Sequence, residues 1–188
     1  MARYVAILAY DGSAYHGYQR QAEGIPTIQS VVEETISGVT GQNVSVIGAG
    51  RTDTGVHAVG QVIAFDVEWS HPDYSLLLAV NSHLPDDIAL QRIWQQEGFH
   101  PRFDAHSRQY RYTVAEVPAR NPLWNPQAWQ IFRQKLDLDA MQLASQQLIG
   151  EHDFGTFGQP PEGSTHTIRE VFRSDWDVLP QDHGKLYI

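Results

Sequence analysis

The order in which strand-like and helix-like patterns alternate over the first half of the chain limits the fold more than any other feature. Residues 3–10 form a β-prone apolar run that ends at Asp11-Gly12, a dipeptide typical of turns. From Thr27, a residue suited to an N-cap, apolar residues recur at helical spacing until Gly41 provides a C-terminal stop. The pattern predicts a strand followed by an amphipathic helix.

The same alternation continues to residue 94. Residues 43–47 and 59–67 alternate as strands do, Asp73 is the predicted N-cap of a second helix, and residues 88–94 read as another strand. The order is therefore β-α-β-β-α-β. This succession is typical of a split βαβ or ferredoxin-like unit, in which two helices back an antiparallel sheet.

The second half begins near residue 99. Its pattern predicts a β-β-α-β unit that lacks a second helix and a closing strand. A loop rich in Pro and Gly occupies residues 157–165. We expect the last strand to lack a neighbour and to leave an unpaired sheet edge, which would favour association. The expected elements are strands at 107–117 and 126–132, a helix at 138–149, a strand near 168–178 and a terminal strand at 185–188.

Composition excludes several classes of protein. The apolar fraction of 41% in 188 residues is enough for a hydrophobic core. The chain has no cysteines, so disulfides and thiolate metal sites are excluded, and its nine histidines show no metal-ligand spacing. We find neither a signal peptide nor an apolar run of the roughly 20 residues that span a bilayer, so we expect a cytoplasmic protein without membrane contact or metal.

The charge distribution leaves two interpretations open. A net charge of −9 argues against a nonspecific nucleic-acid binder, which usually carries a basic surface. Within this acidic chain, arginines alternate with tyrosines over one short span, which suits a polyanion partner or, alternatively, a strand with a solvated arginine face. The residues of this span are Arg102, Arg108, Tyr110, Arg111, Tyr112 and Arg120.

Residues 48–62, GAGRTDTGVHAVGQV, surround Arg51 and Asp53 with glycines. Either a tight turn presents the two charges to a ligand, or they belong to an ordinary solvated loop. A dinucleotide site fails because Asp53 stands where the third glycine of GxGxxG belongs, and the chain has no P-loop. Asp53-Thr54-Gly55 matches the DTG of aspartic proteases, but without a second copy only a homodimer would supply the second aspartate.

The remaining chemistry is a lone carboxylate that acts as a covalent nucleophile beside a cation. Such a reaction needs neither a metal nor a second acid. Detaching uracil from its sugar and rejoining it through carbon is a reaction of this kind, for which the base first leaves the helical stack and is held by aromatic side chains.

The motif GRTDTGVHAVGQV resembles the segment that contains the catalytic aspartate in the tRNA pseudouridine synthase TruA family. Five further blocks resemble that family in the same order and extend the resemblance over nearly the whole chain. They are YDGSAYHGYQRQ at 10–21, TIQSVVEETI at 27–36, VNSHLPDDIAL at 80–90, FHPRFDAHSRQYRY at 99–112 and GEHDFGTF at 150–157.

The resemblance implies roles for three residues: Asp53 as the nucleophile, Arg51 as the basic neighbour that displaces the target base, and Tyr110 as the aromatic that contacts the uracil. Their structural alternatives are a turn cap, a solvated arginine and a core tyrosine. Other residues in the matched blocks are expected to support the loop without chemistry of their own. These are Asp11, Tyr15, Gln19, His57 and Gln61.

The resemblance also implies a fold and partners. The family works without a cofactor, usually as a homodimer with two ferredoxin-like halves per subunit, on uridines 38–40 in the anticodon arm of tRNA. We therefore expect an α+β chain whose halves are residues 1–98 and 99–188. Family members continue through a closing strand and a helix whose basic residue pairs with the catalytic carboxylate, so we expect the second half to be incomplete and the chain to be poorly active.

Three hypotheses remain open from the sequence. The chain is a tRNA pseudouridine synthase, a noncatalytic RNA-binding relic of that family, or an aspartic protease that uses Asp53.

Overall fold

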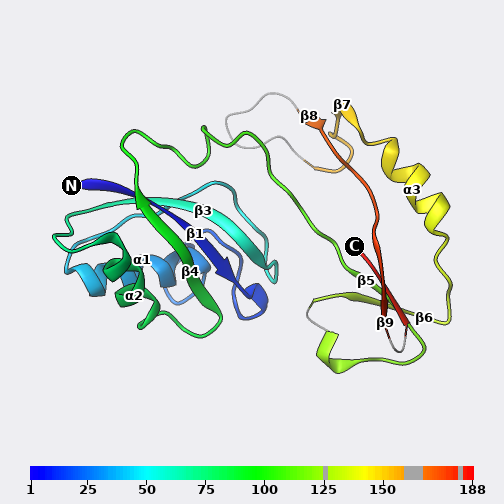
Figure 1. Cartoon of the computed structure of the whole chain (residues 1–188), viewed down its shortest axis with the longest axis horizontal. Coiled ribbons are helices and arrows are strands. Elements are labelled where there is room, and N and C mark those ends of the chain that lie inside the picture. Colours follow the sequence, from blue (N-terminus) through cyan, green and yellow to red (C-terminus); the bar gives the residue numbers. More distant parts are fainter. Residues whose placement is uncertain (125–126, 159–166, 182–183) are drawn as a thin grey trace. The chain divides into compact units, whose positions relative to one another are not determined.

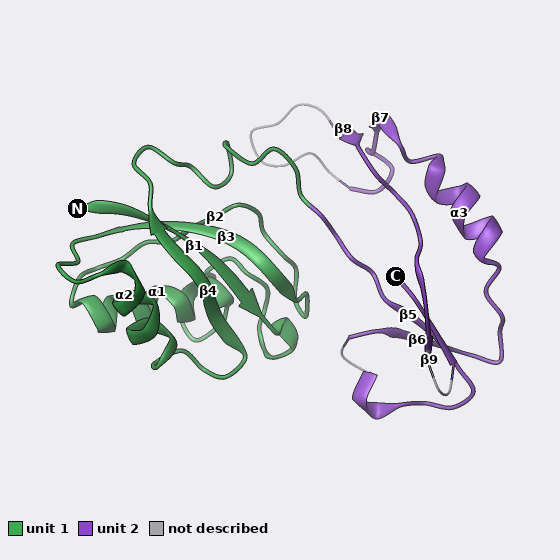
Figure 2. Cartoon of the chain, in the orientation of Figure 1, with its two compact units in different colours: residues 1–108 green, residues 109–188 purple. Residues whose placement is uncertain are grey.

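A computed structural model describes most of the chain, namely residues 1–124, 127–158, 167–181 and 184–188. The loop expected at 157–165 lies almost entirely outside the described residues. The chain divides into two compact units, the first of residues 1–108 and the second of residues 109–188 (Figure 2).

The first unit is a four-stranded antiparallel sheet with two helices on one face (Figure 1). The strands lie in the order β2-β3-β1-β4, and β1 pairs with both β3 and β4. The α+β class and the predicted β-α-β-β-α-β order are confirmed. In chain order the elements are β1 (Ala2–Tyr10), the 3-10 helix η1 (Gly12–Ala14), α1 (Ile28–Thr40), β2 (Ile47–Gly48), β3 (Ala58–Val67), α2 (Asp73–Asn81) and β4 (Ile88–Gln95).

A continuous hydrophobic core fills the space between this sheet and its helices. Tyr4 of β1 and Phe65 of β3 are paired across the sheet and their rings stack with centroids 5.9 Å apart. Ile36 of α1 and Leu76 of α2 are fully buried against the same cluster. Burial of one such side chain contributes about 1.5–3 kcal/mol, so the core fixes the strands from which the candidate site projects.

The ends of α1 lie where the sequence predicted them. The Thr27 hydroxyl accepts a hydrogen bond from the Ser30 amide at 3.2 Å, and the Ser30 side chain accepts one from the Thr27 amide, which forms a capping box. Gly41 closes the helix with φ of 68°, a left-handed conformation that favours glycine.

The predicted role of Asp73 as an N-cap is wrong. Asp73 is the first residue of α2, and Pro72 occupies the cap position without a side-chain hydrogen bond. The Asp73 carboxylate instead accepts a hydrogen bond from Gln95 Nε2 at 2.8 Å. Its charge at the start of the helix still stabilises the helix dipole.

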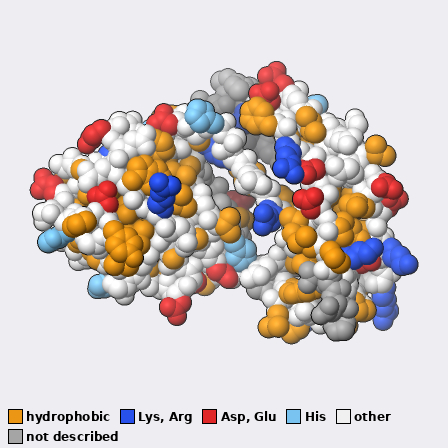
Figure 3. Space-filling view, viewed as in Figure 1, with side chains coloured by type: hydrophobic (Ala, Val, Ile, Leu, Met, Phe, Trp, Pro, Cys, Tyr) orange, Lys and Arg blue, Asp and Glu red, His pale blue; other side chains and the backbone are white. Residues whose placement is uncertain are grey.

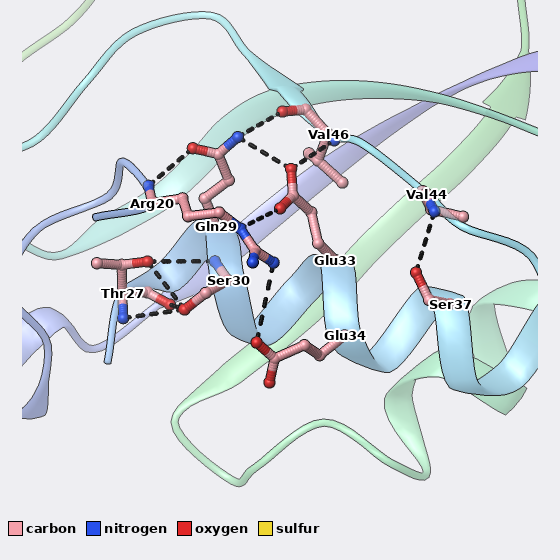
Figure 4. A network of polar contacts seen from close by, with 9 residues as sticks. All are labelled: Arg20, Thr27, Gln29, Ser30, Glu33, Glu34, Ser37, Val44 and Val46. Atoms are coloured by element: carbon pink, nitrogen blue, oxygen red, sulfur yellow. Dashed lines mark hydrogen bonds and ion pairs between the residues drawn. The ribbon is translucent and has the colours of Figure 1, made fainter. Parts of the chain in front are cut away.

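The strand predicted at 43–47 is much shorter, because a helix side chain takes one of the backbone donors that a neighbouring strand would need. Only Ile47–Gly48 pairs with β3. The Val46 amide donates to Glu33 Oε1 of α1 at 2.9 Å (Figure 4). Glu33 is buried, and its charge is balanced by Arg20, whose Nε lies 2.7 Å from Oε2.

The second unit contains a four-stranded sheet, a separate two-stranded sheet and one helix. The larger sheet has the order β6-β5-β10-β9, in which β5 and β6 are parallel and β10 is antiparallel to both its neighbours. The smaller sheet pairs β7 with β8. The elements are β5 (Val114–Val117), η2 (Pro122–Trp124), β6 (Trp129–Phe132), α3 (Leu138–Gln146), β7 (Gly150–Asp153), β8 (Ile168–Val171), β9 (Val178–Gln181) and β10 (Gly184–Tyr187).

Three predicted boundaries in the second unit are wrong. Of the strand expected at 107–117, only the last four residues form a strand, β5. Its partners β6 and β10 are themselves four residues long, which limits the pairing of β5. The helix expected at 138–149 ends at Gln146. The strand expected near 168–178 is two strands in different sheets, β8 and β9.

The terminal strand exists, but it is not an unpaired edge. Residues of β10 pair on one side with β5 and on the other with β9, so β10 lies inside the sheet. Gly184, with φ of 144°, opens this strand where a Cβ atom would clash with the carbonyl oxygen of Glu116. The expected exposed backbone edge at residues 185–188 is therefore a wrong prediction.

Candidate active site

Arg51 and Asp53 lie on the loop that joins β2 to β3, which we call the Asp53 loop (residues 49–57). Gly55 has φ of 80°, and the Val56 amide donates to the Asp53 carbonyl at 3.2 Å, so residues 53–56 form a tight turn. Both charged side chains are exposed. Neither makes a hydrogen bond or an ion pair with another residue in the described part of the chain. The turn thus presents a carboxylate and a guanidinium to solvent.

Thr52, between the two charges, is held by the segment that follows β1. The Tyr10 hydroxyl lies 2.8 Å from Thr52 Oγ1, and the Tyr18 amide donates to the Thr52 carbonyl at 2.9 Å. Burial raises the pKa of Tyr10, so its hydroxyl stays protonated and can donate. Gly17, with φ of 87°, approaches so closely that a Cβ atom would lie 2.8 Å from the Thr52 carbonyl oxygen. Residues 10–18, the N-terminal clamp, therefore fix the backbone beside Asp53.

The far end of the Asp53 loop is held by the same clamp through His57. His57 Nδ1 lies 3.0 Å from Asp11 Oδ1 and 3.3 Å from the Gly12 amide. One nitrogen cannot donate and accept at once, so Nδ1 donates to Asp11 when protonated and otherwise accepts from Gly12. Hydrogen bonds from Ser13 hold the pKa of Asp11 below its usual value, and His57 lowers it further, which keeps Asp11 ionised beside the ring.

Gln61 and Arg108 hold the near end of the loop. Gln61 Nε2 donates to the Gly50 carbonyl at 2.7 Å, and Arg108 Nη2 donates to the Ala49 carbonyl at 2.8 Å. The same Arg108 nitrogen reaches the carbonyl of Arg102 at 3.3 Å. The Asp53 loop is therefore fastened at its middle and at both ends by groups of the first unit.

Of the residues expected to support the loop, Asp11 and Gln61 contact it, and His57, its last residue, contacts the clamp. Tyr15 instead donates to Asp87 Oδ1 at 2.7 Å and fastens the clamp to the turn before β4. The sequence reasoning did not assign Arg108 this role, because its contact with Ala49 joins residues 59 positions apart. The glycines of YDGSAYHGY were the available signal, since Gly12 and Gly17 both approach the loop backbone too closely for a side chain.

Tyr110 belongs to the second unit, where its side chain is 72% exposed. It is therefore not a core tyrosine. Tyr112 is 76% exposed, and Arg111 and Arg120 are exposed as well. Arginine and aromatic side chains are thus available to solvent along this part of the second unit.

A cavity of about 600 Å³ lies elsewhere in the first unit, at the opposite end of β1 from the clamp. It is open to solvent, and its charged lining residues include Glu68 and Glu97. An acidic cavity does not suit a polyanion. Among the described residues, no group of His, Cys, Asp and Glu has an arrangement that could hold a metal ion, and no helix is long and apolar enough to cross a membrane.

A family profile and several curated relatives identify the same family of proteins as similar to this chain. A family profile described as tRNA pseudouridine synthase matches residues 6–104 and 144–188. The tRNA pseudouridine synthase A of Neisseria gonorrhoeae is 41% identical over 175 residues, which covers 92% of this chain and 65% of that relative. A Neisseria meningitidis serogroup C relative of the same name is 41% identical, with 97% and 68% covered.

A more distant relative extends the likeness to another bacterial lineage. The tRNA pseudouridine synthase A of Pseudothermotoga lettingae is 37% identical, over 92% of this chain and 70% of that relative. The chain therefore spans about two thirds of the length of the curated relatives it matches.

Proposed function

The chain belongs to the tRNA pseudouridine synthase family, and from that premise we propose that it isomerises uridine to pseudouridine in the anticodon arm of tRNA, at positions 38–40. The nucleophile is Asp53. The observation that carries this proposal is the exposed Asp53 carboxylate, unpaired among the described residues, on a turn whose backbone is fastened at three places. A rigid backbone holds a nucleophile in the position that the reaction needs, and a small displacement from that position lowers the rate strongly.

The reaction suits a site without a cofactor. The bond between N1 of uracil and C1′ of ribose breaks, a bond between C5 and C1′ forms, and the hydrogen on C5 is lost while N1 gains one. Substrate and product are therefore isomers, and no oxidant or reductant takes part. Asp53 acts by forming a transient covalent adduct that allows the base to turn before it is rejoined.

Arg51 and Tyr110 act on the substrate in this proposal. Arg51, two residues before Asp53 and exposed, displaces the target base from the stack or binds a nearby phosphate. Tyr110 contacts the extruded uracil through its ring, for which its high exposure leaves room. Both roles come from the family resemblance, and the exposure of both side chains supports them.

The finer description of fold and partners is part of the same proposal. We infer two ferredoxin-like halves, residues 1–98 and 99–188, and the strand order β2-β3-β1-β4 with two helices supports this for the first half. The enzyme acts in the cytoplasm on tRNA as a homodimer. The second half departs from the ferredoxin-like pattern, because β5 and β6 are parallel and β7 and β8 form a separate sheet.

A tritium-release assay tests the proposed function. A tRNA transcript labelled with tritium on C5 of uridine releases one tritium for each pseudouridine formed, since C5 loses its hydrogen. We expect release from transcripts with uridine at positions 38–40 and none when these positions carry cytidine. Binding without release would favour the noncatalytic relic, and pepstatin-sensitive proteolysis would favour the aspartic protease.

A further inference from the structure

An ordered pair of aromatic rings lies on the turn between β4 and the end of the first unit. The Phe103 ring stacks on the His100 ring with centroids 4.2 Å apart and planes 26° from parallel. Phe103 is nonetheless 77% exposed, so most of the ring surface meets solvent. Neither ring belongs to the hydrophobic core of the first unit.

Hydrogen bonds hold this turn in one conformation. His100 Nδ1 accepts from the amides of Arg102 and Phe103 at 3.2 and 3.3 Å. The His100 amide donates to Asp104 Oδ2 at 2.8 Å, and the amides of Phe103 and Asp104 donate to the His100 carbonyl. A phenylalanine held in place while exposed to water differs from a single apolar residue on a mobile surface, because its binding partner would meet a preorganised ring.

The turn is connected to the Asp53 loop through one guanidinium group. Arg108 Nη2 donates to the carbonyls of both Arg102, on the turn, and Ala49, on the Asp53 loop. The Arg102 side chain is exposed and has no hydrogen bond or ion pair with any described residue. An exposed aromatic ring beside an available guanidinium is the combination by which proteins hold an unpaired base and its phosphate.

We propose that the His100–Phe103 pair is a stacking platform for an unpaired nucleobase of the RNA, a base other than the target uridine, and that Arg102 contacts the adjoining phosphate. The proposal rests on the proposed RNA substrate. Through Arg108 the platform and the Asp53 loop keep a fixed relation within the first unit, so the platform sets which nucleotide meets Asp53. An uncharged apolar partner would leave Arg102 without a role, whereas RNA complements its charge.

Equilibrium binding of a fluorescein-labelled anticodon stem-loop to the full chain tests this proposal. Since stacking on one base contributes roughly 1–3 kcal/mol, we expect Phe103→Ala to raise Kd about 5- to 150-fold. Phe103→Trp should bind like the unaltered chain, and Phe103→Leu should bind like Phe103→Ala, because leucine keeps apolar volume but loses the ring. Tyr74→Ala on α2, which removes an aromatic side chain that is 68% exposed, should leave Kd unchanged.

The salt dependence of Kd separates the two parts of the site. Arg102→Gln should reduce the slope of log Kd against log salt concentration by about 0.7, as expected for one lost phosphate contact with a single strand, whereas Phe103→Ala should leave the slope unchanged. Restoration of affinity by Phe103→Leu, or equal Kd for Phe103→Ala and Tyr74→Ala, would overturn the platform. If Phe103→Ala lowers the melting temperature, the Kd values of Phe103→Leu and Phe103→Trp still show whether an aromatic ring at this position is needed for RNA binding.

Failure of this inference and failure of the proposed function have different signatures. Unchanged RNA affinity in Phe103→Ala, together with tritium release by the unaltered chain, would overturn the platform and leave the isomerase intact. A loss of affinity in Phe103→Ala without any tritium release by the unaltered chain would overturn the proposed activity and leave the platform.

Discussion

The first unit packs a continuous core between its sheet and two helices, whereas the second unit buries few apolar side chains of its own. In the described part of the second unit the buried hydrophobic residues are Val114, Ala115, Val117 and Tyr187. Large side chains such as Trp129, Phe157 and Phe172 are at least 65% exposed there, and Figure 3 shows hydrophobic side chains spread over the drawn face of this unit.

This difference indicates a division of tasks. The candidate nucleophile belongs to the unit with the stronger internal support, where strands and a clamp fix the loop on which it lies. The exposed aromatic and basic side chains of the second unit suit contacts with other molecules, because an apolar surface of this extent is typical of a contact surface. Such a surface fits the proposed homodimer and the proposed RNA substrate.

Removal of one aromatic ring from each unit tests most directly whether the first unit has the stronger hydrophobic core. Phe65→Ala should lower the free energy of unfolding by about 3–5 kcal/mol, because it leaves a cavity in the core of the first unit. Phe172→Ala, at a side chain 65% exposed in the second unit, should change it by less than about 0.5 kcal/mol. Urea unfolding followed by circular dichroism measures both, and equal effects would show that the second unit has a core of comparable strength.

A glycine substitution tests whether the clamp positions the Asp53 loop. A Cβ atom at position 12 would clash with the Val56 carbonyl, so Gly12→Ala must displace the loop, at a cost of about 1–3 kcal/mol. If the displaced loop raises the barrier of the reaction by a similar free energy, we expect turnover on tRNA to fall about 5- to 150-fold. Gly38→Ala is the control, because it lies within α1 with open space around it and should stabilise the chain slightly. Unchanged turnover in Gly12→Ala would mean that the clamp is dispensable.

Two neighbouring tyrosines of the second unit test whether one particular aromatic ring there contacts the substrate. Tyr110→Ala should weaken transition-state binding by roughly 1–3 kcal/mol, the usual contribution of an aromatic ring that stacks on a base. Tyr112→Ala, at a side chain of similar exposure, should have a much smaller effect on kcat/KM. Tyr110→Phe tests the hydroxyl separately. Equal losses in the two alanine variants would remove the special role of Tyr110.

The smallest expected effect concerns one ion pair in each unit. In the first unit Arg3 Nε donates to Asp66 Oδ1 at 2.8 Å and holds the pKa of Asp66 below its usual value. The pair should stabilise the fold by about 0.5–1 kcal/mol, since Asp66 is partly exposed. Because the folded-state pKa is lowered, this stability is present above the unfolded pKa of Asp and is lost as pH falls through the folded value.

Two charge-removing variants measure this effect. Asp66→Asn should be less stable than the unaltered chain at pH 7 and equally stable below the lowered pKa. Asp175→Asn, which removes the partner of Arg173 in the second unit, should show no measurable change at either pH. A stability difference for Asp66→Asn that persists in acid would trace to packing and not to charge.

The fold of the first unit could be predicted from the sequence where local signals and burial agree. The helical spacing of the apolar residues predicted α1, and Thr27 and Gly41 indicated where it begins and ends. The β-prone segments predicted the order of the elements. The strand at 43–47 was predicted too long because Glu33, distant in sequence, takes the Val46 amide. In the second unit, strand lengths depend on pairing partners that are themselves short, and no local pattern contains that information.

The candidate site was predictable in its charged residues and unpredictable in its supports. The glycines around Arg51 and Asp53 indicated a turn, and the family resemblance gave the roles. The contact of Arg108 with Ala49 joins side chain and backbone 59 positions apart in the sequence, and the hydrogen bond between Tyr10 and Thr52 joins residues 42 positions apart. Sequence spacing alone does not reveal such contacts.

The central claim is that Asp53 is the nucleophile of an enzyme that forms pseudouridine. Tritium release from C5-labelled tRNA should be compared in the unaltered chain, Asp53→Asn and Asp86→Asn, the last a control that removes another exposed carboxylate of the first unit. Asparagine keeps the shape but lacks the anionic oxygen, so we expect Asp53→Asn to lose turnover by about 1000-fold or more while it still binds tRNA. Asp86→Asn should match the unaltered chain. Near-normal release by Asp53→Asn would contradict the account.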